Sequence, residues 1–207
     1  MIDHRNTDGY SAADLTRATL LLRLRADGAE REFAWNEFYE LYSPIIRAYA
    51  RRKGATADVA DEVVQEVLRR FFQAVPKFVY KPTEGRFRGY LKTCTSRVFH
   101  DLAKDLLHAA EQLHEVADRG AGDEALWEGE WRKRRLDLAL EQVRRRYSRR
   151  TDSYKTFRAF EMRTIFQREP HDVAQELGIS VDSVNAANSR VTAALRQAVE
   201  ELADLLD

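Results

Sequence analysis

The spacing of apolar residues is the feature that most constrains how this chain can fold. Along nearly the whole sequence apolar residues recur at intervals of three and four, and runs with the alternation of strands are absent. This spacing gathers apolar side chains on one stripe of an α-helix. Only four prolines and nine glycines interrupt the 207 residues. The sequence therefore predicts an all-α fold.

The distribution of charge along the chain indicates a division into domains. Residues 108–131 carry seven acidic residues, one arginine and three glycines, whereas residues 132–150 carry nine Lys or Arg against two acidic residues. Glycines and charge of one sign are typical of a linker. We therefore expect two small helical domains joined by a flexible acidic linker. The expected bounds are 1–30 for an N-terminal extension, 31–107 for the first domain, 108–131 for the linker and 132–207 for the second domain.

The composition argues against several classes of function. Basic and acidic residues balance at 34 each, so the chain lacks the positive excess typical of a free-standing DNA-binding protein. One cysteine, Cys94, allows neither an internal disulfide nor a thiolate zinc site. No apolar run is long enough for a membrane span, and the first residues do not read as a signal peptide, so we expect a cytoplasmic location without membrane contact. The five histidines have no metal-like spacing, and no glycine loop suits a phosphate. We expect no catalytic residues, no metal and no cofactor, and thus not an enzyme.

Two short helices near the C-terminus have the pattern of a helix-turn-helix. Pro170 suits the start of the first helix, Gly178 suits the left-handed turn, and Ser180 is a good N-cap for the second helix. In such motifs the exposed N-terminal face of the second helix enters the major groove of DNA. An ordinary helical hairpin is the alternative interpretation. The candidate DNA-contacting residues are Ser180, Asp182, Ser183, Asn185, Ala186, Ser189 and Arg190.

A second informative pattern lies between residues 58 and 75. Val64, Val67 and Phe71 fall on one apolar stripe, and a set of polar residues lies roughly opposite. Taken alone, such a polar set is simply the solvated face of a helix. Its members are Asp58, Glu62, Gln65, Glu66, Arg69 and Gln73.

Three blocks of sequence, in this order, resemble bacterial RNA polymerase sigma factors of the extracytoplasmic-function (ECF) class in the sigma-70 family. The first is FYELYSPIIRAYARRKG followed by DVADEVVQEVLRRFF, the second is GRFRGYLKTCTSRVFHDLAK, and the third is HDVAQELGISVDSVNAANSRVTAALRQ. The resemblance implies that residues 31–107 are sigma region 2 and residues 132–207 are sigma region 4. It also implies that the chain directs promoter recognition and transcription initiation by core RNA polymerase.

The resemblance assigns roles to the candidate residues. The C-terminal motif would read the minus-thirty-five promoter element beside the flap of the beta subunit. The residues that would bind the clamp helices of the polymerase beta-prime subunit are Asp58, Asp61, Glu62, Gln65, Glu66 and Arg69. Promoter DNA and an anti-sigma factor are the other partners implied. Arg97 stands where family members usually carry asparagine, and Glu62 stands where they usually carry aspartate. The residues that would contact the minus-ten element are Tyr80, Lys81, Arg86, Arg88, Tyr90, Lys92, Ser96, Arg97, His100 and Lys104.

Two other functions remain open from the residues themselves. One is a conventional helix-turn-helix regulator in which residues 1–107 form an effector or dimerisation domain. The other is a helical adaptor with no role on DNA. Promoter-dependent initiation with core polymerase separates a sigma factor from a regulator, because a regulator cannot start transcription without a resident sigma factor.

Overall fold

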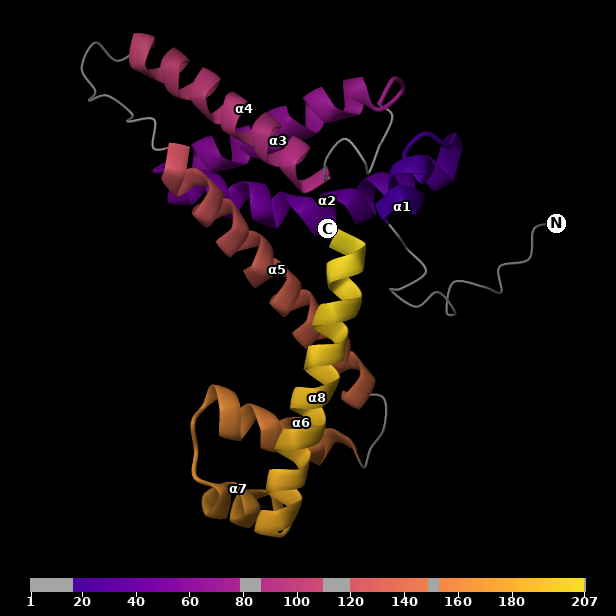
Figure 1. The fold of residues 1–207 in the computed structure, drawn as a ribbon, viewed down its shortest axis with the longest axis vertical. Helices are drawn as coiled ribbons and strands as arrows, with labels where there is room; N and C mark the ends of the chain where they lie inside the picture. Colours follow the sequence, from indigo (N-terminus) through magenta and orange to yellow (C-terminus); the bar gives the residue numbers. More distant parts are fainter. Residues whose placement is uncertain (1–16, 79–86, 110–119, 149–152, 207) are drawn as a thin grey trace, which may run out of the picture. The chain divides into compact units, whose positions relative to one another are not determined.

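The computed structural model confirms the all-α fold. It describes residues 17–78, 87–109, 120–148 and 153–206, and these contain no strand. None of the helices in these ranges is long and apolar enough to cross a membrane. The elements, labelled in Figure 1, are α1 Arg17–Arg23, α2 Gly28–Arg52, α3 Ala57–Ala74, α4 Phe87–Ala109, α5 Gly120–Ser148, α6 Tyr154–Phe160, a π-helical segment Glu161–Ile165, α7 Pro170–Leu177 and α8 Val181–Leu206.

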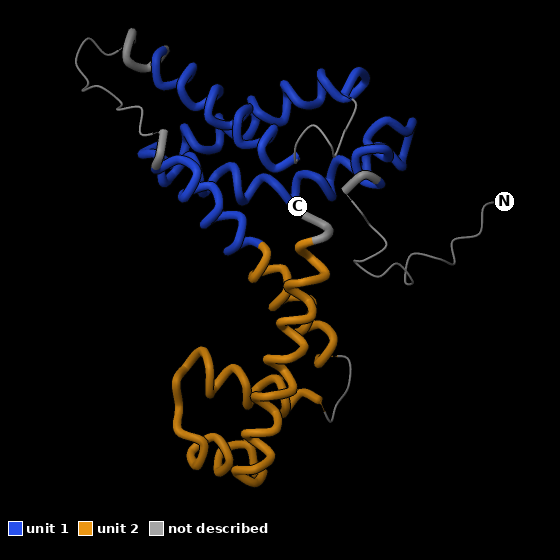
Figure 2. Tube along the Cα trace, viewed as in Figure 1, with its two compact units in different colours: residues 1–134, 205–207 blue, residues 135–204 orange. Residues whose placement is uncertain are grey.

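The chain divides into two compact units, coloured separately in Figure 2. The first holds residues 1–134 with residues 205–207, and the second holds residues 135–204. The division falls inside α5, and residues 120–131 are helical although their glycines and acidic charge predicted a linker. The physical reason is burial, since Trp127 and Trp131 of this stretch are 1% and 0% exposed. Burial of two indoles outweighs the cost of about 1 kcal/mol for each helical glycine.

The first unit is built around an aromatic core between α2, α3 and α4. Phe38 of α2 stacks on Phe71 of α3, with ring centroids 4.8 Å apart, and Phe87 of α4 meets Phe38 edge-on at 5.9 Å. All three rings are at most 2% exposed. Since each contributes a large apolar area, these contacts fix α3 and α4 on α2. The orientation of the polar faces of α3 and α4 follows from this core.

The ends of α3 explain its register. Thr56 has extended backbone angles, and its hydroxyl accepts a hydrogen bond of 3.3 Å from the backbone N–H of Val59. This is the geometry of an N-cap threonine. From there the helix buries Val63, Val64 and Val67 on one side. The opposite side, which bears most of the candidate polymerase-binding residues, faces outward.

The second unit contains the two short helices predicted from the C-terminal pattern. Gly178 between α7 and α8 is left-handed, with φ 61° and ψ 46°, a conformation that glycine adopts without steric cost. The Ser180 hydroxyl accepts a hydrogen bond of 3.1 Å from the N–H of Ser183, and so caps α8. Val173 and Val184 are fully buried between the two helices, and Ile179 packs against them. These contacts set the angle at which α8 leaves the turn.

Candidate functional site

The polar face of α3 divides into residues that face solvent and residues engaged within the protein. Asp58, Glu62 and Gln65 are exposed along one side of the helix. Asp61 is half-buried because its Oδ1 accepts a bond of 2.5 Å from Nε of Arg47 on α2. This ion pair raises the pKa of Arg47, mainly through that hydrogen bond. Asp61 therefore joins α3 to α2, and three groups of the face stay open to a partner.

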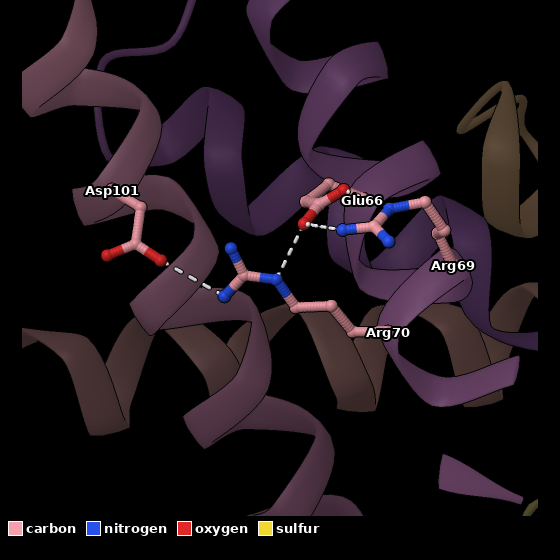
Figure 3. Close-up of polar contacts among 4 residues, drawn as sticks. All are labelled: Glu66, Arg69, Arg70 and Asp101. Carbon is pink, nitrogen blue, oxygen red and sulfur yellow. Dashed lines mark hydrogen bonds and ion pairs between the residues drawn. The ribbon is translucent and has the colours of Figure 1, made fainter. Parts of the chain in front are cut away.

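Glu66 is the centre of a network that links α3 to α4 (Figure 3). Its carboxylate accepts two bonds of 2.7 Å from Arg69 and one of 2.6 Å from Arg70, whose guanidinium also pairs at 3.0 Å with Asp101 of α4. Hydrogen bonds from Arg69 and then Arg70 lower the pKa of Glu66 to about 2. Charge-assisted, bidentate pairs of this kind hold side chains in one geometry. Glu66 and Arg69, both predicted to bind polymerase, are thus paired with each other.

A groove next to this face was not anticipated from the sequence. It is lined by aromatic and apolar side chains of α2 and α3, including Trp35, Tyr39, Leu68 and Phe72. Tyr39 and Phe72 are 43% and 47% exposed, which is high for large rings. Exposed aromatic surface of this kind is typical of a protein-binding site. The available signal was the spacing of four within each pair, Trp35–Tyr39 and Leu68–Phe72, which places each pair on one face of its own helix.

The two aromatic candidates for the minus-ten element are Tyr80 and Tyr90. Tyr90 lies in a cluster with Phe78 at 5.0 Å and with Phe71 and Phe87 at 6.0 Å each. Burial raises the pKa of the Tyr90 hydroxyl to about 12. Tyr90 is therefore half-buried in the core rather than free on the surface. Three further candidates, Tyr80, Lys81 and Arg86, lie outside the described residues.

The polar residues of α4 that were assigned to the minus-ten element lie on one helix but in different surroundings. Arg97 and Lys104 are exposed, whereas Ser96 and His100 are half-buried. Nε2 of His100 lies 3.3 Å from Nζ of Lys53 on α2. Arg88 and Lys92 both pair with carboxylates of α5: Nη2 of Arg88 lies 3.2 Å from Glu128, and Lys92 pairs with Glu124. These two pairs were not predicted, because the acidic residues involved were placed in a linker.

The N-terminal face of α8 presents small polar groups and one cation. All seven of its candidate DNA-contacting residues are exposed, and Val184, Ala187 and Val191 between them are buried. Ser180 uses its hydroxyl in the cap, and Nε of Arg190 donates to the carbonyl of Ala186 at 3.2 Å. The remaining Arg190 nitrogens can still reach outward. This face can accept and donate hydrogen bonds, but it offers little charge to attract phosphates.

Comparison with known protein families finds a match within the first unit. Residues 38–106 match the family model of sigma-70 region 2, a segment that covers most of α2, all of α3 and most of α4. Residues 38–106 are therefore similar to the part of sigma-70 factors called region 2, and this segment is called region 2 below. The match agrees with the resemblance found in the sequence. No curated protein matched the chain.

The match to region 2 covers about a third of the chain. The polar face of α3, the Glu66 network and the cations of α4 all fall inside it. The acidic residues of α5 and the whole second unit fall outside it. The geometry of those parts therefore has to support any role given to them.

Proposed function

We propose that this chain is a sigma factor of the ECF class that binds core RNA polymerase through the outward face of α3 in region 2. The observation that carries the proposal is the set of open groups on that face. Asp58, Glu62 and Gln65 are exposed on the same helix, beside a groove of exposed aromatic rings. Carboxylates and an amide suit a partner surface rich in arginine, and the rings supply apolar contact area. The clamp helices of the polymerase beta-prime subunit are the proposed partner.

Ion pairs within region 2 divide the residues of the α3 face into two proposed roles. Glu66 and Asp61 are bound to arginines of this same chain, so their proposed contribution is to fix the face, and Arg69 is held beside the groove by Glu66. A side chain whose rotamer is already fixed loses less entropy on binding. A pre-organised face of this kind supports tight docking on a rigid helical partner.

For DNA, we propose two weak contacts that act together. Region 2 would use the exposed Arg97 and Lys104 of α4, with residues of the loop before it, to hold the minus-ten element. The N-terminal face of α8 would read the minus-thirty-five element, with its helix beside the flap of the polymerase beta subunit. The α8 contact alone is weak, because Arg190 is the single cation among the proposed α8 residues. Two modules held on one large partner bind with a much higher effective concentration than either alone.

Reconstitution with core polymerase tests the proposal. The wild-type chain is expected to co-purify with core polymerase and to support run-off transcription from its own promoters, which a conventional regulator cannot do. Glu62→Lys is expected to weaken association at least tenfold, since it puts a like charge against an arginine-rich surface. Glu32→Lys, an equal charge change at an exposed position of α2, is the matched control.

The choice of Glu62 rather than Glu66 follows from the ion pairs. Reversal of Glu66 would break its bonds to Arg69 and Arg70, so a loss of binding could come from a disturbed helix. Glu62 is exposed, and its replacement leaves that network intact. If the folded Glu62→Lys variant binds core polymerase as well as Glu32→Lys does, the proposed docking face is wrong. If neither association nor run-off product is seen with the wild-type chain, the sigma-factor function itself is wrong.

A further inference from the structure

The start of α5 lies against the side of region 2 that bears its cations. Asp123 pairs with Lys53 at 2.6 Å, Glu128 pairs with Arg88 at 3.2 Å, and Glu124 pairs with Lys92. Two residues after Glu128, Glu130 pairs with Arg52 at 2.6 Å. One short stretch of helix thus places four carboxylates opposite four cations of α2 and α4. A contact repeated four times is a built interface rather than a single chance pair.

Aromatic packing holds this stretch in place. Trp127 meets the ring of Tyr49 on α2 edge-on at 5.1 Å, and Trp131 lies 5.9 Å from Tyr42. Beyond them, the Arg134 guanidinium donates to the backbone carbonyl of Glu40 at 2.7 Å. These contacts hold the backbone of α5 against α2, with its acidic residues beside the cations. Because they alternate with the tryptophans along α5, docking of the indoles brings the carboxylates to the cations.

The consequence is that the cations of this side are neutralised within the free chain. The Lys53 side chain is only 7% exposed, and those of Arg88 and Lys92 are 18% and 25% exposed. A carboxylate and a phosphate are both anions that accept hydrogen bonds from lysine and arginine. The two compete for the same nitrogens, so α5 occupies positions that a nucleic-acid backbone would need. Arg97 on the same helix is exposed and carries no ion pair among the described residues.

We infer that residues 123–130 of α5 act as an internal competitor that suppresses binding of nucleic acid to region 2 in the free chain. The inference rests on the proposed function, in which α4 contacts promoter DNA. A sigma factor that is free of polymerase would then hold DNA weakly. Region 2 would gain its full cation set once the carboxylates of α5 are displaced. The occupant that displaces them is the phosphate backbone of single-stranded promoter DNA.

Neutral variants of the two carboxylates that face α4 test the inference. The full-length chain with Glu124→Gln and Glu128→Gln retains the buried pair of Asp123 with Lys53. The matched control is Glu32→Gln with Glu40→Gln, two exposed acids of α2, which changes the net charge equally. The probe is a fluorescein-labelled 20-nucleotide single-stranded DNA, and binding is followed by fluorescence anisotropy over a salt series.

The α5 variant is expected to bind the oligonucleotide about fivefold more tightly than the control at low salt. Its plot of log affinity against log salt is expected to be steeper by up to about 1.4, because each freed cation releases roughly 0.7 counterion from a single strand. Equal binding by the two variants would show that net charge alone matters and would overturn the inference. If the double variant loses helical circular dichroism, Glu124→Gln alone is compared with Glu32→Gln, and equal affinities again overturn it.

A separate variant distinguishes failure of this inference from failure of the proposed function. Arg97→Ala removes an exposed cation of α4 that α5 does not cover. If Arg97→Ala weakens oligonucleotide binding while the α5 variant matches its control, α4 binds DNA but α5 does not compete. If Arg97→Ala has no effect in either the wild-type or the α5 variant background, α4 is not a DNA surface, and the DNA part of the proposed function fails with the inference.

Discussion

Helices α4 and α8 each carry a candidate DNA surface, and they differ in how their charge is used. Among the described residues, α4 has several cations, but Arg88 and Lys92 are paired with carboxylates of α5. The candidate residues of α8 include a single cation, Arg190, and all of them are exposed. Charge present in the sequence is therefore different from charge that a partner can reach. The helix that is richer in cations is the more restricted of the two in the free chain.

The ionic and the apolar contacts between α5 and region 2 differ in their contribution to stability. An ion pair at a surface contributes about 0–1 kcal/mol, so the pairs of α5 with α4 are weak enough to be exchanged for pairs with phosphate. The tryptophans of α5 contribute much more, since burial of a large aromatic ring stabilises by several kcal/mol. We expect the apolar contact to hold α5 on region 2 and the ionic contact to decide what region 2 can bind.

The largest expected effect comes from truncation of the α5 anchor. Trp127→Ala removes a fully buried indole and should lower the free energy of unfolding by about 3–5 kcal/mol. Urea denaturation followed by circular dichroism measures this change. Leu136→Ala, at a residue that is 47% exposed, is the control and should change stability by less than about 0.5 kcal/mol. A loss below about 1 kcal/mol in Trp127→Ala would mean that α5 is not part of the folded first unit.

The next effect concerns the exposed surface of α8. Arg190→Ala should weaken binding of the assembled polymerase holoenzyme to a promoter fragment by about 1–3 kcal/mol, the usual value of one good base contact. Arg196→Ala, an exposed arginine further along the same helix, is the control. Electrophoretic mobility shift at fixed salt gives both affinities. Identical losses in the two variants would show that Arg190 contributes only general charge.

A smaller, stabilising effect is expected at Gly129 in the middle of α5. A methyl group added there would meet no atom within 4 Å, and the residue lies in a helix. Gly129→Ala should therefore raise the free energy of unfolding by about 0.4–1 kcal/mol, because alanine loses less backbone entropy in a helix. Urea denaturation measures the gain. No gain would indicate that this stretch behaves as the linker that its composition predicts.

The smallest expected effect is the lowered pKa of Glu66, which a titration measures. Glu66 has a pKa of about 2, below the value of about 4.3 for an unperturbed glutamate. Because the folded-state pKa is depressed, Glu66 stabilises the fold above about pH 4.3, and this contribution is lost as the pH falls toward 2. Side-chain NMR titration should show the low midpoint, and Arg69→Ala should raise it more than Arg70→Ala. A midpoint near 4.3 in the wild-type chain would contradict the network of Figure 3.

Much of the fold could be predicted from local patterns. The apolar period indicates helices throughout, Thr56 is a recognisable cap, and Gly178 with Ser180 indicates a turn and the start of a helix. These features depend on a residue and its near neighbours in sequence, so they can be read without tertiary contacts. The polar face of α3 could be found in the same way, because its period is that of a single helix.

The parts that could not be predicted depend on distant contacts. Residues 120–131 have the composition of a linker, yet Trp127 and Trp131 are buried against α2. Tyr90 is a candidate contact of the minus-ten element, and its packing beside Phe78 and Phe71 follows only from the tertiary structure. In each case the outcome depends on which surfaces the rest of the chain leaves uncovered. Local helix propensity predicts the structure poorly where the burial of an aromatic ring contributes more free energy than the propensity does.

The sequence by itself determined that this chain is helical and that residues 38–106 match sigma-70 region 2, because both follow from the order and spacing of residues within short segments. Tertiary structure decided which charged groups are available. Glu66 is bound by Arg69 and Arg70, Glu62 remains open, and the α4 cations Arg88 and Lys92 are covered by α5. The reason is that an ion pair requires two side chains within about 4 Å, and packing of the aromatic core sets that distance for residues far apart in the chain.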